Sequence, residues 1–165
     1  MVEPPKLHAM HVLEEAAMLG ENPPDDGAKV AILPMGVDHP EGYQVLEIIS
    51  GKINIDQFSD NECVEIIASY SLDFISYPDL NSFIASLVSK VRKGGVIVLG
   101  GIDTYSLSRA ITRDAMSIEE INNLLYSRKS LTDINTTKEF AASLGLEIVS
   151  AHLNGINYEI KARRG

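Results

Sequence analysis

The stretch VEIIASYSLDFISYPDLNSFIASLVSKVRKGGVIVL, residues 64–99, decides the fold. It begins and ends with short apolar runs, residues 64–68 and 96–99, which are typical of strands that helices cover on both faces. Between them, apolar side chains recur at the spacing of one helix face, at Leu80, Phe83, Ile84, Leu87, Val88 and Val91. A strand, a helix and a strand in this order predict two parallel strands joined by a right-handed crossover.

Capping signals mark where the helices of the second half begin and end. Gly94 and Gly145 are typical stop signals after two of the helices. Three polar pairs have the spacing of a capping box and predict helix starts, at Ser76 with Asp79, Ser117 with Glu120, and Thr136 with Glu139.

The last strands and the first half of the chain complete the predicted sheet. Asn154-Gly155 lies between two strand-like runs, residues 146–153 and 156–162, and predicts an antiparallel hairpin. Residues 28–33 resemble a strand that ends near Pro34, whereas residues 43–49 are ambiguous between helix and strand. Residues 6–11 and 13–19 are a strand and a helix, or else residues 8–19 are one helix. We therefore expect a single α/β domain over residues 1–165, with a doubly wound, mostly parallel sheet that ends in an antiparallel hairpin.

Composition restricts the kinds of partner and compartment. The 165 residues carry a formal net charge of −9, and residues 1–65 hold 13 acidic against 3 basic side chains. An acidic first half argues against broad nucleic-acid binding, which needs many phosphate-neutralising cations. No apolar run approaches the ~20 residues of a membrane span, and residues 1–5 do not resemble a signal peptide. With the single cysteine Cys63 no internal disulfide can form, so we expect a cytoplasmic protein.

Residues 59–75 carry a resemblance to a known family. The stretch SDNECVEIIASYSLDFI resembles the pattern PDNSVDEIYASHVLEHF of one branch of the class I, S-adenosylmethionine-dependent methyltransferases. Residues 91–98 resemble the glycine turn and strand of that family, and residues 137–164 resemble its last helix and terminal hairpin. The resemblance implies a methyltransferase-like, Rossmann-type fold, with S-adenosylmethionine as the cofactor and a small molecule or another acceptor as the partner.

The start of the chain departs from the family pattern. The same branch opens with a strand and glycine turn of the form KLHIGCG, whereas here Lys6-Leu7-His8 is followed by Met10 and Val12 in place of both glycines. Glycines let the backbone approach a cofactor closely, and a long or β-branched side chain fits that task poorly. The family acid at position 64 is also replaced by Val64. The pattern thus predicts the fold together with an eroded cofactor turn.

Candidate site residues follow from the rule that ligands of open α/β sheets bind beyond the carboxyl ends of the strands. The resemblance implies that Asp38 after the second strand contacts the ribose and that Asp60 and Asn61 contact the adenine. Turns from the next two strands are expected to hold Tyr70 and Asp103 towards a substrate, as catalytic candidates. The predicted cofactor-binding residues are Met10, Asp38, Asp60, Asn61 and Ser69.

A metal site and a nucleophilic cysteine are the less favoured hypotheses. His8, His11 and His39 lack a cysteine or glutamate at ligand spacing, so no metal is predicted. Cys63 precedes an apolar strand, as a buried structural thiol does.

Two functions stay open at this point. One is an S-adenosylmethionine-dependent methyltransferase of unknown acceptor, which would work mainly by aligning its reactants. The alternative is a methyltransferase-fold protein that has lost cofactor binding and acts as a binding or assembly module. Met10, Val12 and Val64 favour the second function, and the fold signals do not discriminate between the two.

Overall fold

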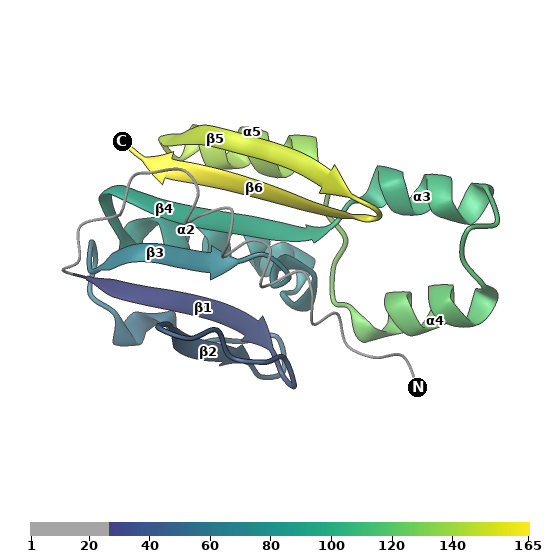
Figure 1. Ribbon diagram of the computed structural model, residues 1–165, viewed down its shortest axis with the longest axis horizontal. Helices are drawn as coiled ribbons and strands as arrows, with labels where there is room; N and C mark the ends of the chain where they lie inside the picture. Colours follow the sequence, from purple (N-terminus) through teal and green to yellow (C-terminus); the bar gives the residue numbers. More distant parts are fainter. Residues whose placement is uncertain (1–26) are drawn as a thin grey trace.

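A six-stranded sheet in the order β2-β1-β3-β4-β6-β5 forms the centre of the computed structural model, which describes residues 27–165 (Figure 1). The strands are β1 (Ala28–Pro34), β2 (Gln44–Ile48), β3 (Cys63–Ala68), β4 (Val91–Ile102), β5 (Leu146–Asn154) and β6 (Asn157–Arg164). The helices are α2 (Leu80–Lys90), α3 (Thr104–Thr112), α4 (Ile118–Ser127) and α5 (Ile134–Ser143).

The pairing of the strands confirms the predicted fold class. β1 pairs in parallel with both β2 and β3, and β3 pairs in parallel with β4. β6 pairs antiparallel with β4 and with β5, so the sheet ends in the predicted hairpin. The hairpin turn includes Gly155, whose φ of 60° suits a glycine.

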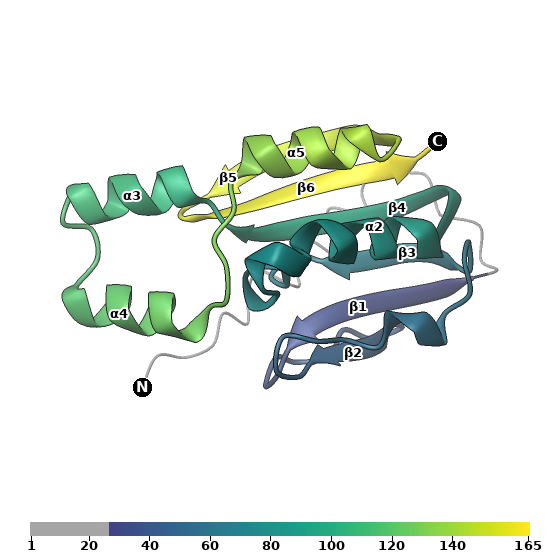
Figure 2. The ribbon, with the colours of Figure 1, turned by 180° about the vertical axis from the view of Figure 1, so that it is seen from behind.

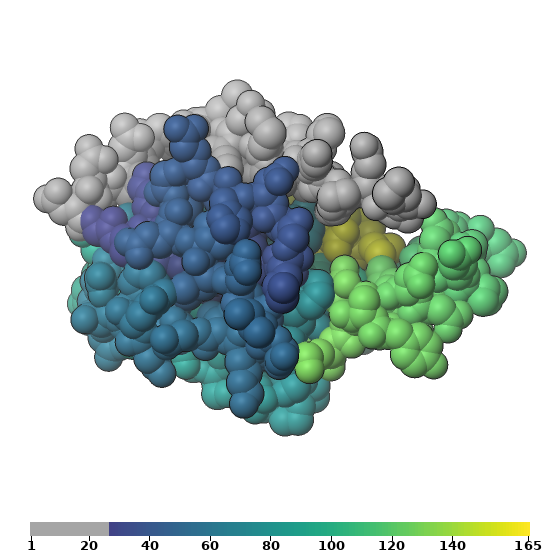
Figure 3. All heavy atoms as spheres, turned by 90° about the horizontal axis from the view of Figure 1, so that it is seen from below, coloured from purple at the N-terminus to yellow at the C-terminus, as the bar shows by residue number. Residues whose placement is uncertain are grey.

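One face of the sheet carries helices that close the hydrophobic core. Figure 2 shows α2 and α5 lying on this face, whereas α3 and α4 extend beyond the end of the sheet. The side chains that pack between the sheet and these helices include Ile32, Ile66, Leu87, Ile97, Leu99 and Ile160, none of which is exposed. In the space-filling view of Figure 3, the green α3–α4 region protrudes from the body of the molecule.

The helix α2 lies where the sequence predicts it, with different ends. Ser76 does not cap the backbone; its hydroxyl donates to the Asp79 carboxylate over 2.5 Å, at the start of a short 3-10 turn. The helix stops at Lys90, four residues before Gly94, because residue 91 already has extended torsion angles. The Arg164 guanidinium donates to the carbonyls of Val88 and Ser89 and satisfies part of this helix end.

The two other predicted capping boxes have different outcomes. The Ser117–Glu120 box is present at the start of α4, with both reciprocal hydrogen bonds made. The Thr136–Glu139 box is not used, because the cap of α5 lies three residues earlier, at Asp133, which accepts from the Thr136 N–H over 2.8 Å. In the first half of the chain, the ambiguous residues 43–49 contain the strand β2.

Candidate functional site

The chain reverses its direction of travel across the sheet between β1 and β3. From β1 it moves outward to β2, and it then returns to place β3 on the other side of β1. Such a switch point leaves a crevice beyond the carboxyl ends of the two central strands, where open α/β sheets bind their ligands. The Ser71 hydroxyl donates to the Ile32 carbonyl over 2.6 Å and joins the ends of these two strands.

The turn after β1 supplies one wall of the switch point. It runs through Pro34, Met35 and Gly36 to Asp38, and Gly36 has a φ of +84° that only glycine adopts without strain. No atom lies within 4 Å of the position that a Cβ on Gly36 would take. Met35 and Asp38 are exposed. The turn therefore presents open backbone at the ligand-binding edge.

The turn after β3 supplies the opposite wall. Ser69 is 6% exposed, and its hydroxyl oxygen is buried without a hydrogen-bond partner. Tyr70 is half-buried, and burial together with the negative charge of Glu159 raises the pKa of its phenol to about 12. A neutral phenol is thus held beside a carboxylate, and His152 Nε2 lies 3.9 Å from Glu159 Oε1. The hydroxyl groups of Ser69 and Tyr70 can orient a ligand by hydrogen bonds. The Ser69 hydroxyl gains most from such a bond, because a buried hydroxyl without a partner carries an energetic cost.

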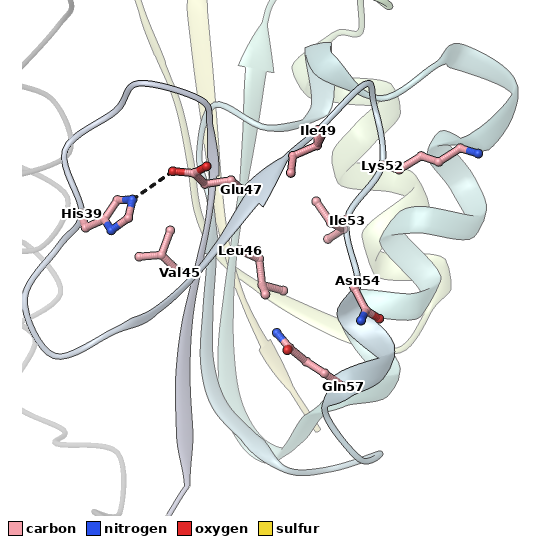
Figure 4. Close-up of a pocket in the computed structure, with 9 residues that line it drawn as sticks. All are labelled: His39, Val45, Leu46, Glu47, Ile49, Lys52, Ile53, Asn54 and Gln57. Carbon is pink, nitrogen blue, oxygen red and sulfur yellow. Dashed lines mark hydrogen bonds and ion pairs between the residues drawn. The ribbon is translucent and has the colours of Figure 1, made fainter.

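A groove of about 630 Å³ adjoins β2 (Figure 4). It lies between β2 and the segment 52–57, and its walls combine aliphatic and polar side chains. At one end, the Glu47 carboxylate lies 3.2 Å from His39 Nε2. The residues that line the groove are His39, Val45, Leu46, Glu47, Ile49, Lys52, Ile53, Asn54 and Gln57. Its volume falls within the range of about 300–1,000 Å³ that is usual for small-molecule sites.

Asp103 closes the end of β4 as a structural cap. Its carboxylate is 2% exposed and accepts from the backbone N–H groups of Ser106, over 2.8 Å, and Ile134, over 3.0 Å. Burial raises the pKa of Asp103, but the hydrogen bonds from Ile134 and Ser106 outweigh it and hold the pKa below its ordinary value. The two carboxylate oxygens therefore accept hydrogen bonds at the starts of α3 and α5. A catalytic role for Asp103 stays a prediction.

Glycines at the end of β4 allow a second buried carboxyl group, Asp73, to lie against the strand. A Cβ on Gly101 would lie 2.5 Å from Asp73 Oδ1, and one on Gly100 would lie 2.2 Å from the Ser69 carbonyl oxygen. The Ile102 N–H donates to both oxygens of Asp73, over 3.0 and 3.1 Å. Close backbone approach thus explains these two glycines.

Asp60 and Asn61 lie at the opposite edge of the sheet from the switch point. They precede β3, whereas Ser69 and Tyr70 follow it. Asp60 forms an ion pair with Lys90 over 2.8 Å, and the Asn61 side chain accepts from Arg164 over 2.9 Å. The hydrogen bond from Lys90 is the main reason why the pKa of Asp60 lies below its ordinary value. The structure does not bring these two residues together with the other candidates.

The placement of β1 changes the interpretation of the glycine turn. Met10, the remaining cofactor candidate, lies outside the described residues. Both edges of β1 and of β3 are paired with described strands, so the turn at the switch point is the one after β1. Asp38 accordingly follows the first strand of the described sheet, not the second.

Sequence reasoning missed Glu47 and the groove. Glu47 lies near the end of the ambiguous stretch 43–49, and only the pairing of that stretch as β2 brings the carboxylate to the ligand edge, opposite Leu33. An acidic residue near the end of the strand that follows the Gly36 turn was the signal available in the sequence.

Residues 27–165 offer neither a metal-binding cluster nor a reactive thiol. No group of three or more histidine, cysteine, aspartate or glutamate side chains in residues 27–165 can hold a metal ion. Within the same range, no helix combines the length and apolar character that a membrane crossing requires. Cys63 is buried, and burial is the main cause that raises the pKa of its thiol to about 11, so it is unreactive as a nucleophile.

Several solved structures with a similar fold are described as methyltransferases. A SAM-dependent methyltransferase from Archaeoglobus fulgidus superposes with a TM-score of 0.58 at 12% identity, over 96% of this chain and 94% of that chain. A Thermotoga maritima SAM-dependent methyltransferase, described as a possible histamine N-methyltransferase, matches with a TM-score of 0.58 at 13% identity, over 97% and 89%. An S-adenosylmethionine-dependent methyltransferase from Mesorhizobium loti matches with a TM-score of 0.54 at 11% identity, over 86% and 93%.

These comparisons establish the methyltransferase-type fold, as the sequence predicted. No protein-family model and no curated protein matches the chain. Because all three identities are low, the likeness concerns the fold and leaves activity to be argued from the site.

Proposed function

We propose that this protein binds S-adenosylmethionine at the switch point and acts as a methyltransferase on a small-molecule acceptor. The observation that carries the proposal is the position of Glu47. It borders a groove of about 630 Å³ along β2, the edge strand that pairs with β1 in a methyltransferase-type sheet. When bound there, S-adenosylmethionine supplies an electrophilic methyl group on a sulfonium.

The groove has the chemistry that an adenosine group requires. A carboxylate at the end of the second strand of such a fold accepts hydrogen bonds from ribose hydroxyls, and Glu47 holds that position. Ile49 and Ile53 offer aliphatic surface for the faces of a planar base, and Asn54 adds an amide. Glu47 and Ile49 come from β2 and the residue just beyond it, and Ile53 and Asn54 come from the segment 52–57.

The methionine portion would extend towards the turns after β1 and β3. Gly36 leaves open backbone on one side, and the unpartnered Ser69 hydroxyl offers a hydrogen bond on the other. Tyr70, with Glu159 and His152 behind it, borders the same edge and would orient the acceptor. This arrangement keeps Ser69 and Asp38 as cofactor candidates and Tyr70 as a candidate at the acceptor.

Calorimetric titration with S-adenosylhomocysteine tests this proposal. The native chain should bind at micromolar Kd, and Glu47→Gln should weaken binding by about 10- to 100-fold, because one charged acceptor of two hydroxyl groups is lost. Glu41→Gln is the matched control, since Glu41 is also an exposed glutamate but does not line the groove. Equal affinities for the two variants would refute the role of Glu47.

One observation favours the alternative of a module that has lost its cofactor. The turn after β1 has the sequence Leu33-Pro34-Met35-Gly36, which contains a single glycine where such turns usually hold several small residues. Complete absence of binding in the same titration would support this alternative and contradict the methyltransferase proposal.

A further inference from the structure

A helical arm, defined as residues 104–127, projects from the carboxyl edge of the sheet. It consists of α3, α4 and the connection between them, and both views of the ribbon show it extending beyond the strands (Figures 1 and 2). Backbone hydrogen bonds hold it at its two roots. The Thr104 N–H donates to the Thr132 carbonyl over 2.9 Å, and the Lys129 N–H donates to the Asp73 carbonyl over 2.7 Å.

The arm exposes an unusual share of apolar surface. Among residues 27–165, ten large apolar side chains are exposed, and five of them lie in this arm. They are Tyr105, Ile111, Ile118, Leu125 and Tyr126. Exposed apolar side chains that gather on one part of a surface mark an interaction site more often than scattered ones do.

The helix α4 has an apolar face that no element of residues 27–165 buries. Ile118, Ile121 and Leu125 recur at helical spacing, yet no residue of α4 is buried. A helix of ten residues is marginal in water by itself, and such helices gain most of their stability from packing of the apolar face. We therefore expect another apolar surface to pack against this face of α4.

Charge indicates that this surface belongs to a second copy of the chain. Each chain carries a net charge of −9, and residues 1–65 hold 13 acidic against 3 basic side chains, so contact between two copies through that half is disfavoured. The arm carries charges of both signs, with Arg109 and Arg113 on or next to α3, and with Asp114 in the connection and Glu119 and Glu120 on α4. No described ion pair involves Arg113 or Glu119. In a two-fold contact the same patch faces itself, so α3 of one copy can meet α4 of the other with opposite charges.

We propose that two copies of this protein associate through their arms, with α3 of each copy packed against α4 of its partner. Antiparallel packing of these helices brings the arginine end of α3 to the glutamate end of α4. It also encloses Tyr126, Leu125 and Ile118 against the partner's arm, as in a four-helix arrangement. The proposal goes beyond the methyltransferase activity and does not depend on it.

Sedimentation velocity on the full chain tests the proposal, at concentrations up to about 100 μM, where a Kd near 10 μM leaves most chains paired. We expect a dimer for the native protein and a monomer for Tyr126→Asp, which places a charge in the centre of the contact. Tyr77→Asp is the matched control and should remain dimeric, because Tyr77 is 70% exposed and lies outside the arm. Far-UV circular dichroism should show both variants folded.

A charge reversal makes the test specific for the paired helices. Arg113→Glu and Glu119→Arg should each be monomeric alone, because each brings like charges together twice. Mixing the two variants should restore dimers, since every facing pair then has opposite charges. A native protein that is monomeric at every concentration would overturn the proposal, as would a dimer that Tyr126→Asp and both charge variants leave intact.

Discussion

Asp73 is a buried carboxyl group whose protonation should affect stability. It is 3% exposed, and burial raises its pKa to about 6, although the Ile102 N–H and the Arg128 charge act in the opposite direction. The folded state therefore holds the proton more tightly than the unfolded chain, where the pKa is near the ordinary 3.8. The free energy of unfolding should rise by about 1–3 kcal/mol as pH falls from 7.5 to 4, with most of the change between the folded pKa of about 6 and pH 4.

Urea unfolding at pH 7.5 and pH 5 measures this effect when Asp73→Asn serves as the reference. The amide can still accept from the Ile102 N–H but does not titrate in this range, so the variant should lack this part of the pH dependence. If the free energy of unfolding changes equally for the native protein and for Asp73→Asn between the two pH values, the burial of an ionised Asp73 has no measurable cost.

The candidate site residues on either side of β3 differ in how well the sequence predicted their positions. Ser69 and Tyr70 were predicted at the end of a strand, and they follow β3 directly, because a short apolar run identifies its own end. Asp60 was predicted for the adenine but lies before β3, where it pairs with Lys90. The adenine role of Asp60 came from the family resemblance, whereas the strand predicted over residues 64–68 already placed Asp60 before its amino end and not beyond its carboxyl end.

At the scale of elements, α2 shows which apolar positions support the core. Leu87 is fully buried between α2 and the sheet, whereas Phe83 of the same predicted face is only half-buried. Leu87→Ala should lower the free energy of unfolding by about 2–5 kcal/mol, and Phe83→Ala by less than the roughly 3 kcal/mol typical of a fully buried phenylalanine. Chemical denaturation compares the two variants. A larger loss for Phe83→Ala would contradict the packing of α2.

The helix starts show how local signals compete. Ser117 and Glu120 form their capping box, because the residues on either side offer no stronger cap. At α5 the Asp133 side chain lies three residues before Thr136 and accepts its N–H, so the helix begins earlier than the Thr136–Glu139 spacing indicates. Aspartate and threonine are both good caps, and the tertiary bond from Ile134 to Asp103 favours the earlier start.

At the scale of the whole molecule, the described residues should unfold as one unit. All six strands belong to one sheet, and the residues of β1, β3, β4 and β6 share one hydrophobic core. Thermal unfolding followed by far-UV circular dichroism and by tyrosine fluorescence should therefore give coincident transitions. Two separated transitions would contradict the prediction of a single domain over residues 1–165.

The sequence by itself determined the strand–helix–strand unit of β3, α2 and β4 and the terminal hairpin of β5 and β6. These elements follow from apolar periodicity and turn chemistry within a few tens of residues, which act before distant contacts form. The position of β1 at the switch point, the place of Glu47 beside the groove and the exposed apolar face of α4 among residues 27–165 became visible only in the folded chain. The physical reason is that strand order and helix partners depend on pairing between segments far apart in the chain, and local patterns specify an apolar face without specifying what will cover it.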